Sequence, residues 1–153
     1  FASKKEILEQ AFLSIHGEID AAIEKYFTEN KLNLEGDNVF QICLDTWMLY
    51  YRYWRNHPAR RAFYDAFIHS HYISEKLWTQ NNAAYTFFSQ MFGKLMGSIA
   101  ENMGHKAFAF IWPVIIESAI IMARRANETG ELLDEESKQM IGRILQSILG
   151  FAL

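Results

Sequence analysis

The sequence predicts an all-α fold in a single domain. Apolar residues recur at steps of three and four along most of the 153-residue chain, which is the period of an amphipathic helix. Only two prolines and eight glycines are present, too few for the many turns of a β-sandwich or barrel. Half of the residues are apolar, so the chain can bury a sizeable core. We therefore expect six helices in one domain that spans residues 1–153.

The first two helices differ in how much of their surface is apolar. Ser3 and Glu6 stand three residues apart just before an apolar stripe, which is the pattern of a capping box. The stripe predicts a helix over about Lys4–Thr28, with charged residues on its opposite face. The second helix, over about Val39–Asn56, carries an apolar band too wide for a helix with half its circumference in water.

Proline, serine and glycine mark the bounds of the next two helices. Pro58 ends the second helix and suits the first turn of a third, where its missing N–H costs nothing. That third helix is expected to fray near residues 69–72. Ser74 is placed to cap a long fourth helix that runs to about Asn102, and Gly104 suits the position just after its end.

The last two helices are the most apolar part of the chain. A fifth helix over about Lys106–Asn127 is apolar nearly all round and is expected to be buried on both sides, with a kink at Pro113. Its apolar run, residues 107–123, is shorter than a membrane span and contains Glu117, so we expect no membrane segment. Asp134 is expected to cap a sixth helix that ends at about Leu149.

The charge and the cysteine content of the chain argue against direct nucleic-acid binding and favour a reducing compartment. The net charge of −3 argues against direct nucleic-acid binding by these residues, because phosphate binding needs clustered Lys and Arg. Cys43 is the single cysteine, which excludes an internal disulfide and suits a reducing compartment. No secretory signal is present at the start. We therefore expect a cytoplasmic protein.

The opening residues, FASKKEIL, resemble a junction in the tetracycline-repressor (TetR) family of transcription regulators. In that family an aromatic residue ends the helix-turn-helix domain, and Phe1 resembles that residue. A Ser-Lys-Glu-rich segment then opens the connecting helix, and residues 3–8 resemble that segment. The resemblance implies the regulatory half of such a regulator, with residues 1–3 as the junction to an absent N-terminal DNA-binding domain. It further implies a homodimer whose last two helices form a four-helix bundle, and contact with DNA only through the absent domain.

Aromatic side chains on the second to fifth helices predict a pocket for a small lipophilic effector. Ligand pockets are lined mainly by apolar and aromatic groups, and buried Tyr and Trp need polar partners. The alternative interpretation is that these rings only fill the core. The expected pocket residues are Trp47, Tyr50, Tyr51, Trp54, Phe63, Phe67, Trp78, Asn81, Tyr85, Phe88, Phe92, Trp112 and Glu117.

Glu117 is a charged residue among about ten apolar neighbours, where an unpaired carboxylate is costly. Together with aromatic faces it suits a lipophilic cation. It also suits an ion pair with Arg124 or Arg125 of a second subunit, or an ordinary place facing solvent or a partner in its own subunit. The sequence leaves these interpretations open.

The apolar seams of the last two helices predict a two-fold dimer interface, because large exposed apolar areas usually meet a partner. The expected interface residues are Ile120, Arg124, Met140, Ile141, Ile144, Leu145 and Ile148.

No constellation for catalysis or for a metal is recognised in the sequence. His69 and His71 are two apart and point to different faces of a helix. His69, His71 and His105 fall near helix ends, which disfavours a globin-like haem site. We expect no enzyme activity, cofactor or metal. The alternatives to the regulator are an all-α cofactor protein or enzyme, and a purely structural dimerisation module.

Overall fold

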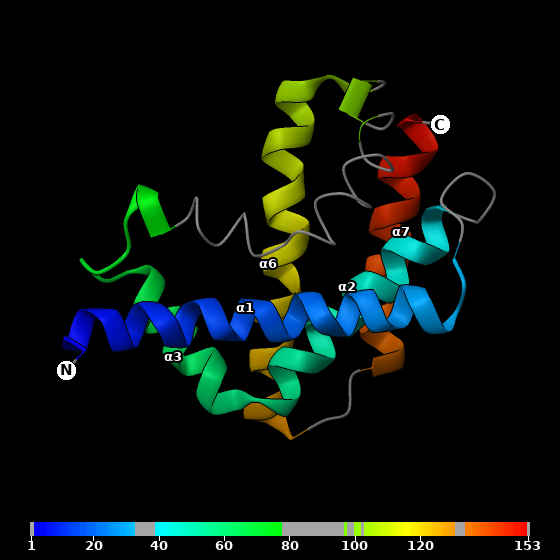
Figure 1. Ribbon diagram of the computed structural model, residues 1–153. Helices are drawn as coiled ribbons and strands as arrows, with labels where there is room; N and C mark the ends of the chain where they lie inside the picture. The colour runs from blue at the N-terminus through cyan, green and yellow to red at the C-terminus, as the bar shows by residue number, and fades with distance from the viewer. Residues whose placement is uncertain are drawn as a thin grey trace.

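The computed structural model describes residues 2–32, 39–77, 97, 100–101, 103–130 and 134–152, and no strand occurs among them (Figure 1). The all-α fold class predicted from the sequence is therefore confirmed. Most of the predicted fourth helix lies outside the described residues. The long helices are α1 (Lys4–Glu29), α2 (Val39–Asn56), α3 (Pro58–Ile68), α6 (His105–Thr129) and α7 (Asp134–Ala152).

The start of α1 is the capping box expected from the sequence. The Glu6 backbone N–H donates to the Ser3 hydroxyl at 3.2 Å, and the Ser3 N–H donates to the Glu6 carboxylate at 2.7 Å. These two bonds satisfy donors that the first helical turn leaves unpaired. The helix ends at Glu29, one residue beyond the prediction.

The boundaries of α2 and α3 follow the predicted pattern. Pro58 occupies the first turn of α3, directly after the single non-helical residue His57. The helix ends at Ile68, and the next four residues form turns and a bend. The prediction that α3 frays near residues 69–72 is therefore confirmed.

Ser74 and Gly104 mark helix boundaries as expected from the sequence. The Ser74 hydroxyl accepts the Leu77 N–H at 3.2 Å, as at a helix start. Gly104 has a φ of 95° and donates to the Ala100 carbonyl at 2.9 Å, which ends one helix and precedes another. α6 then continues past Pro113 to Thr129 as one helix.

Asp134, which was expected to cap the last helix, forms ion pairs with α2. It is the first residue of α7, and its carboxylate pairs with Arg55 and, at 3.5 Å, with Arg52. Both arginines belong to the last turns of α2. The ion pairs therefore tie the start of α7 to the end of α2.

α2 is the central helix of the described fold and packs against α1, α3, α6 and α7. α6 and α7 run in opposite chain directions, and α1 crosses in front of α6 (Figure 1). The Trp47 indole N–H donates to the Ile115 carbonyl at 3.0 Å and to the Ser118 hydroxyl at 3.1 Å, which joins α2 to α6. The prediction that α2 lacks a broad solvent face agrees with this central position.

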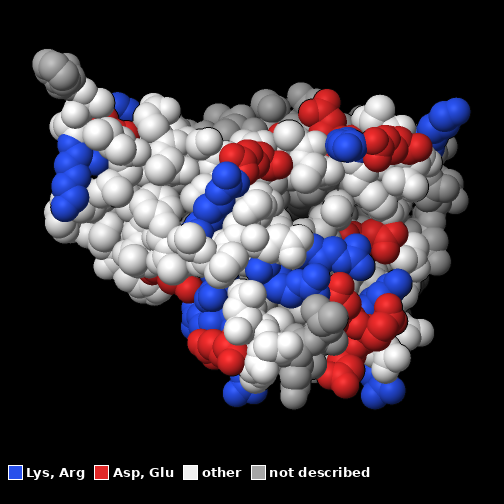
Figure 2. Space-filling model, turned by 90° about the horizontal axis from the view of Figure 1, so that it is seen from below, with Lys and Arg blue, Asp and Glu red and all other residues white. Residues whose placement is uncertain are grey.

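Charges pair locally on the surface. Glu18 of α1 accepts from the Tyr53 hydroxyl at 3.1 Å and pairs with Arg60 of α3. Figure 2 shows Lys and Arg interspersed with Asp and Glu on the face it presents, with no extended patch of one sign. Over the residues described, no helix combines the length and apolarity that a membrane crossing requires.

His16 is a titratable group inside the core. It lies on α1, is buried, and its ring centroid is 4.6 Å from that of Phe12 and 5.5 Å from that of Tyr64. Burial lowers its pKa to about 4. The unfolded chain, with a His pKa near 6.5, therefore takes up a proton at a higher pH than the folded chain does.

Stability should consequently fall as the pH drops from about 6.5 towards 4. From the two pKa values we expect His16 to account for a loss of about 2 kcal/mol between pH 7 and pH 5. Urea unfolding of the wild type and of His16→Gln at both pH values measures this directly. The variant should lose less stability than the wild type, whereas equal losses would contradict the assignment.

Candidate functional site

Aromatic rings from α2 and α3 form a continuous cluster that also contacts α1 and α6. Trp47 and Tyr51 stack with ring centroids 5.5 Å apart and planes 6° apart. The Trp54 ring contacts Tyr50 at 5.9 Å and Tyr64 of α3 at 4.9 Å. Residues four apart on α2 share a face, so these rings lie along one side of the helix.

The cluster is packed as part of the core. Trp47, Tyr51 and Trp54 are at most 3% exposed, and Phe67 is equally buried. Phe63 is half-buried and stacks on Phe67 at 5.5 Å. The structure thus brings the predicted residues of α2 and α3 together, and it places most of these rings against one another.

Six further predicted pocket residues have side chains outside the described set. Five lie outside the described residues, and Trp112 belongs to α6 with its side chain outside the described set. The five are Trp78, Asn81, Tyr85, Phe88 and Phe92.

Tyr64 is a member of the cluster that the sequence prediction missed. It is buried, and its ring stacks on Phe12 of α1 at 5.9 Å with planes 8° apart. The buried positions of α3 are Arg61, Tyr64 and Phe67, a spacing of three. That spacing was available in the sequence, but Arg61 concealed the stripe because arginine is rarely buried.

Glu117 is an exposed residue of α6. Its side chain is on the surface of α6, and its charge acts on the phenols of Tyr50 and Tyr64. Burial raises the pKa of Tyr64 to about 12, and the negative charges of Glu117 and Asp65 add to that rise. Burial also raises the pKa of Tyr50, with further contributions from Tyr64 and Glu117.

These four residues, Tyr50, Trp54, Tyr64 and Glu117, are named the aromatic corner below. They come from α2, α3 and α6, so any molecule bound there contacts three helices at once. Tyr64 also contacts α1 through Phe12 and His16. Trp54 is fully buried and Tyr50 and Tyr64 are each 8% exposed, so the rings of the corner are packed against one another.

Outward-facing apolar residues occur on both α6 and α7. Val114 and Ile121 on α6 are 66% and 53% exposed, and they lie seven residues apart on one face of the helix. Met140 and Ile144 on α7 are 46% and 43% exposed and lie one turn apart. Large apolar side chains this exposed on adjacent turns are typical of an interface.

Six of the seven predicted interface residues are apolar, and they divide into three groups. Met140 and Ile144 are among these exposed residues, and Ile148 has its side chain outside the described set. Ile120, Ile141 and Leu145 are instead buried in the core of the chain itself.

Arg124 also has a partner within the chain. Its guanidinium is 2.7 Å from the Asp65 carboxylate of α3. It therefore joins α6 to α3 in the single chain. On α6 the prediction missed Val114 and Ile121, which carry the exposed apolar surface.

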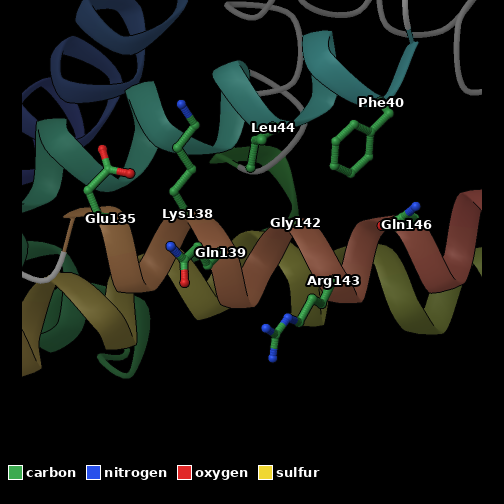
Figure 3. Close-up of a pocket in the computed structure, with 8 residues that line it drawn as sticks. All are labelled: Phe40, Leu44, Glu135, Lys138, Gln139, Gly142, Arg143 and Gln146. Carbon is green, nitrogen blue, oxygen red and sulfur yellow. The ribbon is translucent and has the colours of Figure 1, made fainter.

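A surface groove runs between α2 and α7 and has a volume of about 340 Å³ (Figure 3). Phe40 and Leu44 reach from α2 toward Gly142, where a Cβ would lie 3.6 Å from Phe40 Cζ. Polar side chains of α7 form its other wall, and Arg143 points away from α2. No sequence pattern indicated this groove, because its lining residues are spread over two helices. The α7 wall consists of Glu135, Lys138, Gln139, Arg143 and Gln146.

Metal-binding groups and the single thiol can be assessed in the described residues. They contain no group of three or more His, Cys, Asp or Glu side chains arranged to hold a metal ion. The Cys43 thiol is buried, and burial raises its pKa to about 12. The thiol therefore stays protonated near neutral pH, so it is a poor nucleophile.

Comparison with known proteins found no matching family model, no matching curated protein and no matching solved structure. The functional conclusion therefore depends on the residues and their geometry.

Two tyrosine hydroxyls give a test of the packing. The Tyr51 hydroxyl is fully buried without a hydrogen-bond partner among the described residues, whereas the Tyr26 hydroxyl donates to Asp45 at 2.5 Å. Removing an unsatisfied buried hydroxyl should be neutral or stabilising, and removing a bonded one should destabilise.

We therefore expect Tyr51→Phe to raise the free energy of unfolding by up to about 1 kcal/mol and Tyr26→Phe to lower it by about 1–2 kcal/mol. Chemical denaturation of both variants beside the wild type measures the two changes. A loss of stability in Tyr51→Phe as large as that in Tyr26→Phe would show that the Tyr51 hydroxyl has a partner.

Proposed function

We propose that this chain is the ligand-sensing and dimerisation domain of a transcription regulator similar to the TetR family. The observation that carries the proposal is that α6 and α7, which run antiparallel and both pack on α2, each bury one side and expose apolar residues on the other, namely Val114, Ile121, Met140 and Ile144. Two copies of such a pair pack as a four-helix bundle around a two-fold axis.

The capped start of α1 and the aromatic corner support the same proposal. α1 follows the FASK junction that resembles the family, and its capping box holds the first turn in a defined place. A small lipophilic effector binds at the aromatic corner and favours one helix arrangement over the other. Only that difference in affinity shifts the equilibrium between the two arrangements.

Contacts within the chain connect the corner to α1. Tyr64 stacks on Phe12, and Glu18 of α1 pairs with Arg60, one turn before Tyr64 on α3. A movement of α3 against α2 therefore changes the position of α1. In the proposed regulator, α1 passes this change to the DNA-binding domains, whose separation must match half-sites about one helical turn apart.

A purely structural dimerisation module is the second candidate. The observation that favours it is the tight burial of Trp47, Tyr51 and Trp54, which leaves these rings to serve as core. Such a module would dimerise without binding a small molecule. Ligand binding therefore distinguishes the two candidates.

The dimer is tested by placing a charge on the exposed face of α6. Ile121→Glu should dissociate the dimer to monomers at micromolar concentration, because it places a carboxylate in an apolar interface. Ile7→Glu is the matched control, since Ile7 is similarly exposed, at 58%, but lies on α1. Sedimentation velocity measures both. A monomeric wild type, or equal dimerisation by both variants, would contradict the proposed interface.

Effector binding is tested with Nile red, a neutral lipophilic dye. The regulator hypothesis predicts saturable binding with a blue-shifted emission and a rise in Tm. At a free dye concentration of 100 times Kd the stabilisation should be about 2.7 kcal/mol. No saturable binding and no change in Tm would favour the structural module instead.

A further inference from the structure

The groove between α2 and α7 has an apolar floor and a polar rim. Phe40 and Leu44 of α2 form the floor, and Gly142 adds no side chain on the α7 side. Its volume of about 340 Å³ is within the usual size of small-molecule pockets, about 300–1,000 Å³. An apolar group placed there contacts both helices and leaves water at the same time.

Gly142 keeps this groove open at a cost to its helix. It lies inside α7, where glycine is less stable than alanine because its backbone is freer in the unfolded chain. The packing of α7 on α2 does not require glycine, since an added Cβ would lie 3.6 Å from Phe40 Cζ, an ordinary contact distance. A longer side chain would extend into the space beside Phe40, so glycine leaves that space free.

Lys138 supplies a positive charge to the groove. It is half-buried, and Figure 3 shows its side chain rising from α7 toward α2. Within the described part of the chain it forms no ion pair. Its ammonium group has three donors and no acceptor, so an anion can pair with it directly.

The other polar side chains of the lining agree with an anion on the Phe40 side of Lys138. The lining has two cationic side chains and one anionic one, although the whole chain has a net charge of −3. The anionic one is Glu135, which lies on the far side of Lys138 from Phe40 (Figure 3). Gln139 and Gln146 add amide N–H donors to the same wall.

We propose that this groove binds a hydrophobic carboxylate, with its apolar part against Phe40 and Leu44 and its carboxylate beside the ammonium group of Lys138. The site goes beyond the proposed function and does not depend on it, because the groove shares no residue with the aromatic corner.

The groove also stays open in the proposed dimer. Met140 and Ile144, the exposed apolar residues of α7, are each two positions from Gly142. Residues two apart on a helix do not face the same side. A partner that covers Met140 and Ile144 therefore leaves the groove accessible to a ligand.

Three ligands with the same decyl chain test the charge. Decanoate is an anion, decyltrimethylammonium is a cation, and decanol is neutral. Isothermal titration of the wild-type chain at low salt, below the concentrations at which micelles form, should give a Kd for decanoate at least about tenfold below that for the cation, with decanol between them. No binding of decanoate, or equal Kd values for all three, would overturn the proposal.

Substitution of Lys138 locates the charge. Lys138→Gln should raise the Kd for decanoate about fivefold, as expected for one partly exposed ion pair, and leave the Kd for decanol unchanged. Lys106→Gln is the matched control, because Lys106 is an exposed lysine of α6 outside the groove lining. Equal effects of the two variants would show that net charge, and not Lys138, attracts the ligand.

Substitution of Gly142 locates the apolar part. Gly142→Leu should raise the Kd for decanoate at least about tenfold, because the new side chain fills the groove. Gly17→Leu is the matched control, since Gly17 lies inside α1 with open space around its Cβ position. Gly142→Ala adds only the Cβ and should fold at least as stably as the wild type while binding decanoate less tightly. Wild-type affinity in both folded Gly142 variants would place decanoate elsewhere and overturn the proposal.

Discussion

The indole of Trp47 joins α2 to α6, and α2 in turn packs against the other long helices that the structure describes. Its buried N–H has acceptors on one turn of α6 only, the Ile115 carbonyl and the Ser118 hydroxyl. A buried N–H without an acceptor costs about 1–3 kcal/mol, so this pair of bonds restricts the rotation of α2 about its axis. Tyr51 then stacks on the indole, and Trp54 is carried one turn further to meet Tyr64 of α3.

Because α2 is surrounded by other helices, the proposed dimer surface lies on other elements of the fold. α2 contacts all four other long helices, so neither pocket nor interface can be built on α2 alone. α6 has one face against α2, and its other face carries Val114, Glu117 and Ile121 on the surface. The proposed dimer surface therefore lies on the side of α6 that faces away from α2.

Local signals predicted the helices well, because caps, prolines and glycines act within a few residues. The capping box at Ser3 and the turn at Gly104 are examples. The face of α6 was harder to predict. That helix is apolar nearly all round, so no polar stripe marks its outer side, and Ile120 was predicted outside where Ile121 is exposed.

The site was predictable only in its residue types. Buried aromatic residues look alike in sequence whether they line a pocket or fill a core, and burial separates the two only once the helices are placed. The prediction therefore named Trp47 and Tyr51 together with Glu117, although the first two are packed in the interior and Glu117 is exposed. Native mass spectrometry of the purified chain tests the account most directly, because it reports the subunit count and any bound small molecule together. We expect a mass of two chains, with a small molecule released on denaturation when one has co-purified. A bare monomer would contradict it.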